Sequence, residues 1–289
     1  MKHALVFGAS GQVGLPLLAR LQRDGWRITA LSRSERNDEP GLHWLQGDFA
    51  HLPALPARAD AVFSCGPLDL FSHWYAKSGI EAERVVAFGS TSAEVKSDSP
   101  DDAERDVARR LHMGEARVLD TANERGARAT LLRPTLVYGA GRDHTLTRIA
   151  AMAQRWKRLV LPRRANGLRQ PVHVDDLAKA AFDSAATDAN AGNIYALPGG
   201  ETLPYREMVL RVLATLQPKP PLLEVPGPVF AMLLKSAQAR GIATGLGDAA
   251  VDRMRTDLVF DAAPAQRDFG YAPRQFHPAR GMFEPREDA

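Results

Sequence analysis

The seven residues Gly8-Ala9-Ser10-Gly11-Gln12-Val13-Gly14 decide the fold of this chain. They follow an apolar run at 4–7, which predicts a buried strand, and they precede residues 13–21, whose apolar spacing predicts a helix. A strand, a glycine-rich turn and a helix place backbone N–H groups against a pyrophosphate. Gly8 permits the tight turn, Gly11 lets phosphates approach the backbone, and Gly14 lets helix and strand pack closely. The stretch predicts a dinucleotide site made by Gly8, Ser10, Gly11, Gln12, Val13 and Gly14.

Length, composition and charge bound the class of protein. The 289 residues can bury a full core, and 45% hydrophobic with 25% charged residues is ordinary for a globular chain. A net charge of +3 suits an anionic ligand but, without a concentrated basic arm, argues against nucleic acid. The single cysteine, Cys65, excludes an internal disulfide and fits a reducing compartment. Because we find neither a signal peptide nor a membrane-spanning stretch, we predict a cytoplasmic protein with no membrane partner.

Short apolar runs alternate with helical patterns through the first half of the chain. This rhythm predicts an α/β fold, a Rossmann-type doubly wound parallel sheet covered by helices on both faces. The predicted strands are Ala4–Phe7, Arg27–Leu31, His43–Leu45, Ala61–Ser64, Val85–Phe88, Thr130–Leu132 and Asn193–Leu197. From residue 201 the sequence becomes helical and proline-interrupted, which predicts a smaller, mainly helical C-terminal lobe. We assign 1–140 and 168–198 to the nucleotide-binding domain, and 141–167 and 199–289 to the lobe that holds a substrate or partner.

Several motifs follow the predicted strands in a fixed order. They are the loop 8–14, Gly47-Asp48, Ser64-Cys65-Gly66, Gly89-Ser90-Thr91-Ser92, the run 132–139 (LRPTLVYG), and Arg169 with Val172-His173-Val174-Asp175-Asp176. In this order they resemble the extended short-chain dehydrogenase/reductase superfamily, in particular its nucleotide-sugar epimerase and dehydratase branch. The resemblance covers about residues 1–200 well and the remainder loosely. It implies a nicotinamide cofactor on the sheet and a substrate between two lobes.

The end of the second strand indicates which cofactor is used. NAD enzymes place an acid there for the ribose 2′-hydroxyl, whereas NADP enzymes place a basic residue for the 2′-phosphate. This chain offers Ser32 and Arg33, with no acid before Glu35, so NADP(H) is favoured over NAD(H). The resemblance places further residues against the cofactor: Asp48, Phe49, Cys65, Gly66, Pro67, Arg133, Pro134 and Thr135. The alternative for Arg33 is an exposed loop residue, and for Asp48 a turn residue.

The chain departs from the pattern of this superfamily at the catalytic dyad. Family members use Tyr-x-x-x-Lys, in which the lysine lowers the pKa of the tyrosine. Aligning Gly114-Glu115 with the Gly-Glu that follows this lysine puts Val107 and Leu111 at the two positions, and no tyrosine in the chain has a lysine four residues later. His112 is the nearest titratable replacement, although an exposed helical histidine is the simpler interpretation. The chain therefore resembles an atypical member.

The predicted substrate site draws on motifs from both lobes. Thr91 and Tyr138 are the catalytic candidates, because a hydroxyl can hold a substrate carbonyl. The candidate substrate-binding residues are Ser90, Ser92, Arg142, Arg169 and His173. The alternatives are an ordinary turn for the serines, a pair with Asp175 or Asp176 for Arg169, and packing for His173. No spacing of histidine, cysteine or acids suggests a metal site.

Two functions of different class remain open at this point. The first is an NAD(P)(H)-dependent oxidoreductase or epimerase on a small polar or anionic substrate, working without the usual dyad. The second is a non-catalytic NADP(H) sensor or assembly protein, whose partner would bind near Pro228–Leu234. Core packing is otherwise expected for that stretch, with an interfacial helix as the alternative. By analogy with the superfamily, a homodimer would form through helices at Leu68–Gly79 and Asp106–Asp120.

Overall fold

The computed structural model describes residues 1–143, 145–239 and 248–284. The chain divides into two compact units. Unit 1 comprises Met1–Thr135, Val174–Pro198 and Asp261–Pro273, and unit 2 comprises Leu136–His173, Gly199–Phe260 and Arg274–Ala289. Residues 261–273, which the sequence analysis placed in the smaller lobe, therefore belong to unit 1. Residues 144, 240–247 and 285–289 of the predicted lobe lie outside the described residues.

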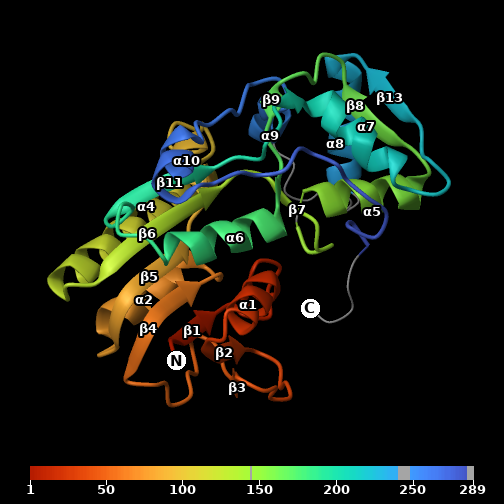
Figure 1. Cartoon of the computed structure of the whole chain (residues 1–289). Coiled ribbons are helices and arrows are strands. Elements are labelled where there is room, and N and C mark those ends of the chain that lie inside the picture. Colours follow the sequence, from red (N-terminus) through yellow and green to blue (C-terminus); the bar gives the residue numbers. More distant parts are fainter. Residues whose placement is uncertain (144, 240–247, 285–289) are drawn as a thin grey trace. The chain divides into compact units, whose positions relative to one another are not determined.

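Unit 1 is built on a seven-stranded parallel sheet, as predicted (Figure 1). Its strands are β1 (His3–Phe7), β2 (Arg27–Ser32), β3 (Leu42–Gln46), β4 (Arg58–Ser64), β5 (Glu81–Phe88), β6 (Arg128–Pro134) and β11 (Asn193–Leu197). Their order in the sheet is β11-β6-β5-β4-β1-β2-β3. The order reverses between β1 and β4, which is the switch point where doubly wound sheets bind ligands.

Helices cover both faces of this sheet. They are α1 (Gly14–Arg23), α2 (Leu68–Lys77), α3 (Ser92–Val95), α4 (Asp102–Glu124), α6 (Val174–Ser184) and α10 (Ala263–Phe269). Helices α1 and α6 pack together on one face, and α2 and α4 pack together on the other (Figure 1). The core on the α2–α4 face is aromatic, because Phe7 contacts both Phe71 and Trp74.

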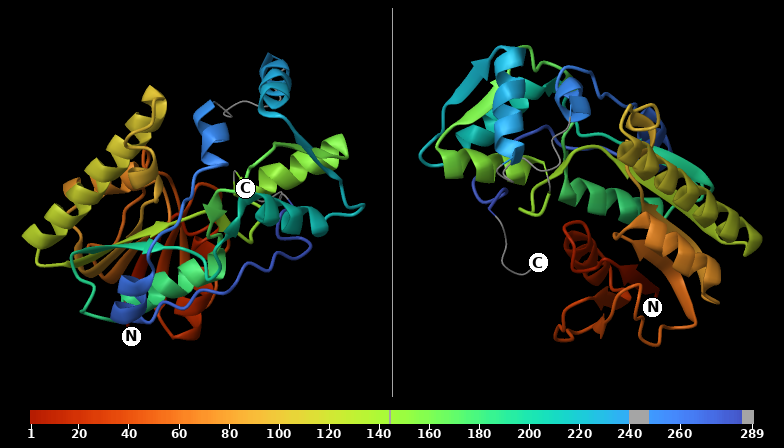
Figure 2. Two further views of the ribbon diagram at one scale, coloured as in Figure 1. Left: turned by 90° about the horizontal axis from the view of Figure 1, so that it is seen from above. Right: turned by 180° about the vertical axis from the view of Figure 1, so that it is seen from behind.

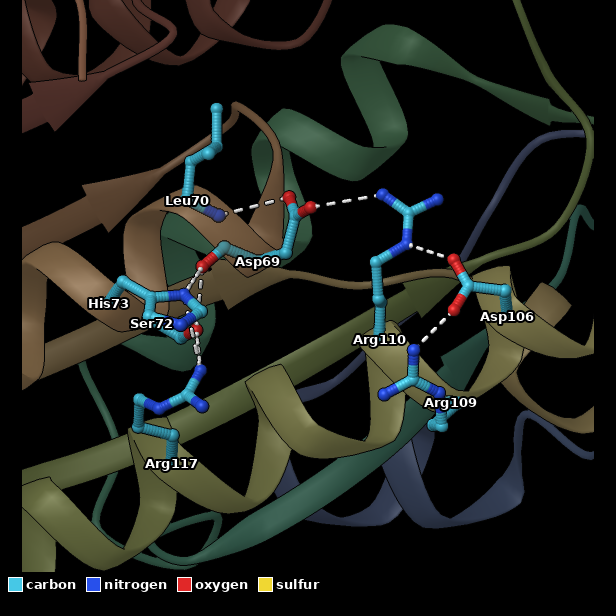
Figure 3. Close-up of polar contacts among 8 residues, drawn as sticks. All are labelled: Asp69, Leu70, Ser72, His73, Asp106, Arg109, Arg110 and Arg117. Atoms are coloured by element: carbon cyan, nitrogen blue, oxygen red, sulfur yellow. Dashed lines mark hydrogen bonds and ion pairs between the residues drawn. The ribbon is translucent and has the colours of Figure 1, made fainter. Parts of the chain in front are cut away.

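Helices α2 and α4 are also joined by polar side chains at their surface, which Figure 3 shows. Arg110 of α4 reaches Asp69 of α2 at 3.3 Å and Asp106 of its own helix at 3.0 Å. Arg117 of α4 donates to the Ser72 hydroxyl at 2.9 Å. These contacts link the two helices at their exposed surface.

Unit 2 combines helices with short two-stranded ribbons. Its strands are β7 (Val137–Tyr138), β8 (Leu159–Pro162), β9 (Leu168–Arg169), β10 (Val172–His173), β12 (Leu203–Pro204) and β13 (Leu222–Val225). Its helices are α5 (Leu146–Trp156), α7 (Tyr205–Ala214), α8 (Gly227–Ala239) and α9 (Asp248–Arg253). The ribbons pair β7 with β10, β9 with β12, and β8 with β13. Within the described ranges, no helix has the length and apolarity needed to cross a membrane.

Candidate functional site

The glycine loop after β1 is tight enough to require all three of its glycines. Gly8 has φ +65°, and a Cβ there would lie 2.7 Å from the backbone of Cys65 and Gly66. A Cβ on Gly14 would lie 2.3 Å from the Gly8 carbonyl oxygen, and the Gly11 N–H donates to that same oxygen at 2.9 Å. Any side chain at Gly8 or Gly14 would therefore push β1, β4 and α1 apart.

The start of α1 offers unsatisfied polar groups. No side chain caps the first N–H groups of this helix, because the residue before it is Val13. The Gln12 Oε1 atom is buried and has no hydrogen-bond partner. Buried polar atoms normally find a partner, so such an atom beside a glycine cradle fits a polar ligand. The loop thus suits the pyrophosphate and ribose of a dinucleotide.

The end of β2 is basic, as the sequence indicated. Ser32 is buried and its hydroxyl accepts the Ser34 N–H at 3.2 Å, whereas Arg33 is exposed. The sequence analysis missed Arg36, whose guanidinium lies 5.2 Å from the centre of the Trp44 ring. In the sequence, this contact is indicated only by an arginine in the loop after β2 and an aromatic residue in β3. Arg33 and Arg36 therefore both lie in the loop that follows β2.

The residues predicted against the adenine and the central cofactor lie on neighbouring loops. The Asp48 Oδ1 atom accepts the backbone N–H of His51 at 2.8 Å and of Ala50 at 2.9 Å, and these bonds lower the pKa of Asp48. Phe49 stacks on Phe7, with ring centres 5.3 Å apart. Burial raises the pKa of the Cys65 thiol to about 12, so this thiol stays protonated and is a poor nucleophile. Gly66 and Pro67 follow it and lead into α2.

The predicted hydroxyl site follows β5. Thr91 is buried, and its hydroxyl donates to the Pro134 carbonyl oxygen at 3.2 Å. The Ser90 hydroxyl accepts the Ser92 N–H at 3.1 Å. The backbone N–H of Thr135 in turn donates to Leu197 at 3.3 Å. The loops after β5, β6 and β11 are therefore tied together, and the Thr91 hydroxyl already has one partner within the protein.

Arg133 has different neighbours from those expected. We predicted that it contacts the cofactor, but its guanidinium binds the buried Glu115 carboxylate at 2.7 Å and 2.5 Å, and Glu94 at 2.5 Å. These bonds raise the pKa of Arg133, with Glu115 the main cause. The His112 Nε2 atom lies 3.0 Å from the Ala93 carbonyl oxygen. The cluster fixes α4 to α3, and the sequence analysis missed it because Glu115 served there only as an alignment marker.

Two of the predicted residues of unit 2 lie in its core. Tyr138 is 1% exposed and packs edge-on against His173, 5.1 Å away, and Phe276, 4.9 Å away. Gly139 has φ +114°, and a Cβ there would lie 2.5 Å from the His173 ring. We expected Tyr138 to enter a cleft, but its side chain is packed in the core of unit 2. For His173 packing was the alternative interpretation, and its side chain is packed as well.

Arg169 is buried and makes its hydrogen bonds to backbone carbonyls. Its guanidinium donates to Leu168 at 2.7 Å, to Thr256 at 2.8 Å and also to Arg253. It lies 5.4 Å from the centre of the Tyr205 ring, and burial lowers its pKa. Arg142 is half-buried in the segment that precedes α5. The contacts of Arg169 are those of a residue that holds β9 to the segment around 253–256.

The carboxyl ends of the parallel strands bring most of the cofactor candidates to one edge of unit 1. The loops that follow β1, β2, β4 and β5 contain Gly8, Arg33, Cys65 and Thr91, respectively. Parallel strands end on the same edge of a sheet, which is where a bound ligand lies. The candidates Tyr138, Arg142, Arg169 and His173 belong to unit 2. Their predicted role with a substrate stays a prediction.

Comparisons with known proteins agree with this arrangement. Residues 66–197 match the NAD dependent epimerase/dehydratase family. The chain is 27% identical to the 2-alkyl-3-oxoalkanoate reductase of Stenotrophomonas maltophilia, over 93% of this chain and 94% of the relative. In fold it is similar to the UDP-glucose 4-epimerase of Thermotoga maritima (TM-score 0.67, 12% identity, covering 94% of this chain and 93% of that one). It is also similar to MoeE5 in complex with UDP-glucuronic acid and NAD (TM-score 0.69, 19% identity, 95% and 94% covered). The glycine loop, the strand order and these likenesses show a Rossmann-type fold, and residues 66–197 are similar to the NAD dependent epimerase/dehydratase family.

Proposed function

We propose that the protein is an NADP(H)-dependent oxidoreductase or epimerase that acts on a small anionic substrate. The observation that carries the cofactor preference is the end of β2, where Arg33 and Arg36 stand and no acid precedes Glu35. A guanidinium can make charge-assisted hydrogen bonds to a 2′-phosphate, whereas a ribose 2′-hydroxyl would favour a carboxylate. The single cysteine supports a reducing, cytoplasmic setting.

The substrate class is supported by the relatives. One acts on a 2-alkyl-3-oxoalkanoate, and the MoeE5 structure holds UDP-glucuronic acid. Both molecules carry a carboxylate, and unit 2 offers Arg142 in the segment before α5. We propose that Arg142 pairs with the anionic group.

The chemistry must proceed without the usual tyrosine and lysine. A bound nicotinamide would supply hydride exchange, and the protein's own residues would orient the substrate carbonyl. Rotation of the Thr91 hydroxyl from the Pro134 carbonyl would let it donate to a substrate oxygen. Positions 107 and 111 of α4 are a valine and a leucine, so the proton comes from solvent or from the substrate itself. The packing of Tyr138 argues against its predicted catalytic role.

Thermal unfolding with NADP, NADPH, NAD and NADH tests the cofactor assignment. A ligand at about 100 times its Kd adds about 2.7 kcal/mol to the free energy of unfolding, which raises the Tm by about 5–10 °C. We expect the shift with NADPH and not with NADH. The Arg33→Ala/Arg36→Ala variant should remove the difference, and Arg23→Ala, an exposed arginine on α1, is the matched control.

Turnover separates the enzyme from the sensor. NADPH consumption with a 2-alkyl-3-oxoalkanoate, or interconversion of a sugar nucleotide such as UDP-glucuronic acid, would establish an enzyme. Binding of NADPH without turnover of either class would instead support the non-catalytic sensor. The enzymes among the relatives favour the first outcome.

We further propose a homodimer through α2 and α4, whose outer surfaces expose Leu70 and Met113. Sedimentation of the intact chain, compared with the Leu70→Asp/Met113→Asp variant, tests this contact. A dimer that becomes a monomer in the variant is expected. A monomer in both cases would contradict the proposal.

A further inference from the structure

Helix α8 carries apolar side chains on two opposite faces. Phe230 and Leu234 are buried and pack against Val160 of β8 and Val225 of β13. The opposite face exposes Val229, Met232 and Leu233, whose exposed fractions are 39%, 64% and 43%. The spacing of these three residues is that of one helix face. The sequence analysis favoured core packing for this stretch. Only the helix face with Phe230 and Leu234 is packed in this way.

The neighbouring ribbon also exposes an apolar side chain. Leu223 of β13 is 41% exposed and lies on the same face of its strand as Val225, which packs against Phe230 and Leu234. Figure 2 shows α8, in light blue, at the edge of unit 2 beside this ribbon. We call Leu223, Val229, Met232 and Leu233 the α8 patch.

Basic side chains surround the α8 patch. The segment 155–164, which contains β8, holds five arginines and lysines and no acid, and all five are exposed. Arg163 donates its N–H to Val225 just before α8 begins, and the Arg255 guanidinium lies 3.3 Å from the Cβ position of Gly227, the first residue of the helix. Lys235 is exposed on α8 itself. By sequence, the segments of unit 2 hold 18 arginines and lysines against 10 acids, whereas those of unit 1 hold 19 against 24.

We propose that the α8 patch binds an anionic phospholipid surface, with α8 lying in the plane of the interface. An apolar helix face bordered by basic residues is the pattern of a membrane-surface helix. Its apolar side chains enter the acyl boundary while its lysines and arginines reach the headgroups. This proposal goes beyond the sequence analysis, which predicted no membrane partner, and it does not depend on the proposed cofactor or substrate.

The charge pattern favours a lipid surface over a protein partner. A symmetric contact with a second copy would bring two basic segments together, and like charges across an interface repel. Lys235 is exposed on α8, and at a bilayer its ammonium group can extend to the headgroups. The cytoplasmic leaflet of membranes carries the anionic lipids that this surface requires.

Co-sedimentation of the full chain with vesicles tests the proposal. One set of vesicles is phosphatidylcholine alone, and the other contains phosphatidylglycerol in equal parts. We expect binding to the anionic vesicles only, and weaker binding as salt is added. The Met232→Ser/Leu233→Ser variant should bind at least about tenfold more weakly. The Arg163→Gln/Arg164→Gln variant should lose about fivefold for each charge removed.

Two controls keep the test decisive. The variant Ile194→Ser/Val259→Ser removes two exposed apolar side chains elsewhere and should bind like the original chain. The Tm of every variant should match the original, because only exposed side chains are changed. Equal sedimentation with both vesicle types, or an unaffected Met232→Ser/Leu233→Ser variant, would overturn the proposal. So would an oligomer that this variant disperses without any vesicle binding, which would assign the patch to a second copy.

Discussion

Arg133 in unit 1 and Arg169 in unit 2 are both buried arginines on short stretches of strand, and the protein neutralises them in opposite ways. Arg133 faces two carboxylates, which raise its pKa. Arg169 faces backbone carbonyls and an aromatic ring, and burial lowers its pKa. Both occur in motifs of the superfamily and were predicted to bind ligands. The difference shows that a motif arginine in this fold can be fully used by the protein itself.

The largest effect should come from breaking the carboxylate pair. Glu115→Gln leaves the Arg133 charge buried opposite a neutral amide, and we expect a loss of about 3–5 kcal/mol in the free energy of unfolding. Chemical denaturation measures it. The matched control is Glu94→Gln, whose side chain is 51% exposed and should cost less than about 1 kcal/mol. Equal costs at both positions would show that Arg133 is held by both acids alike.

A smaller effect is expected at the arginine without carboxylates. Arg169→Met removes the donors of three backbone carbonyls but leaves no charge unpaired, so the expected loss is about 1–3 kcal/mol. Arg169→Lys keeps the positive charge but lacks the forked guanidinium that reaches both Thr256 and Arg253. It should therefore recover only part of the lost free energy of unfolding. The same denaturation experiment measures both variants. A larger loss of stability for Arg169→Met than for Glu115→Gln would contradict the expectation that the carboxylate pair is the more costly to break.

Acid should distinguish the two modes of pairing as well. Glu201 of unit 2 binds Arg211 through both carboxylate oxygens, and these bonds lower the pKa of Glu201. A lowered carboxylate pKa gives stability that is present above the ordinary pKa and is lost as the pH falls through the folded value. The difference between the original chain and Glu201→Gln should therefore shrink on acidification. The difference for Arg169→Met should change less with pH, because Arg169 bonds backbone carbonyls and is acted on by Asp257 only through its charge.

The smallest effect should come from the exposed pairs between α2 and α4. Arg110 binds Asp69 and Asp106, and all three side chains are partly solvated (Figure 3). Exposed ion pairs gain little, because water and salt screen them. Arg110→Ala should leave the midpoint of denaturation unchanged within error. A clear loss would mean that these surface contacts, unlike most, help to hold the two helices.

The sequence predicted the local elements well and the long-range partners poorly. All seven strands of the sheet and the helix after Gly14 follow from apolar periodicity and the glycine loop. The polar residues 81–84 of β5 were missed, because they form strand only by pairing with β4. The partners of Arg133 lie 18 and 39 residues away, and no periodicity indicates such pairs. For Pro228–Leu234 the sequence left core packing, a partner surface and an interfacial helix open, because an apolar helix looks the same in sequence whether one face or both are covered.

The division of the chain has a consequence for its biosynthesis. The chain passes between the two units five times, and unit 1 receives its last segment, Asp261–Pro273, after most of unit 2 has been made. That segment holds the edge strand β11, because Asp268 accepts the Tyr195 hydroxyl and Tyr271 donates to Pro198, each at 2.7 Å. Until the segment Asp261–Pro273 leaves the ribosome, β11 lacks these contacts. Its free edge can then pair with other nascent chains. A ribosome that stalls near residue 260 should therefore produce fragments that aggregate or are degraded, even though every residue of the glycine loop is already in place.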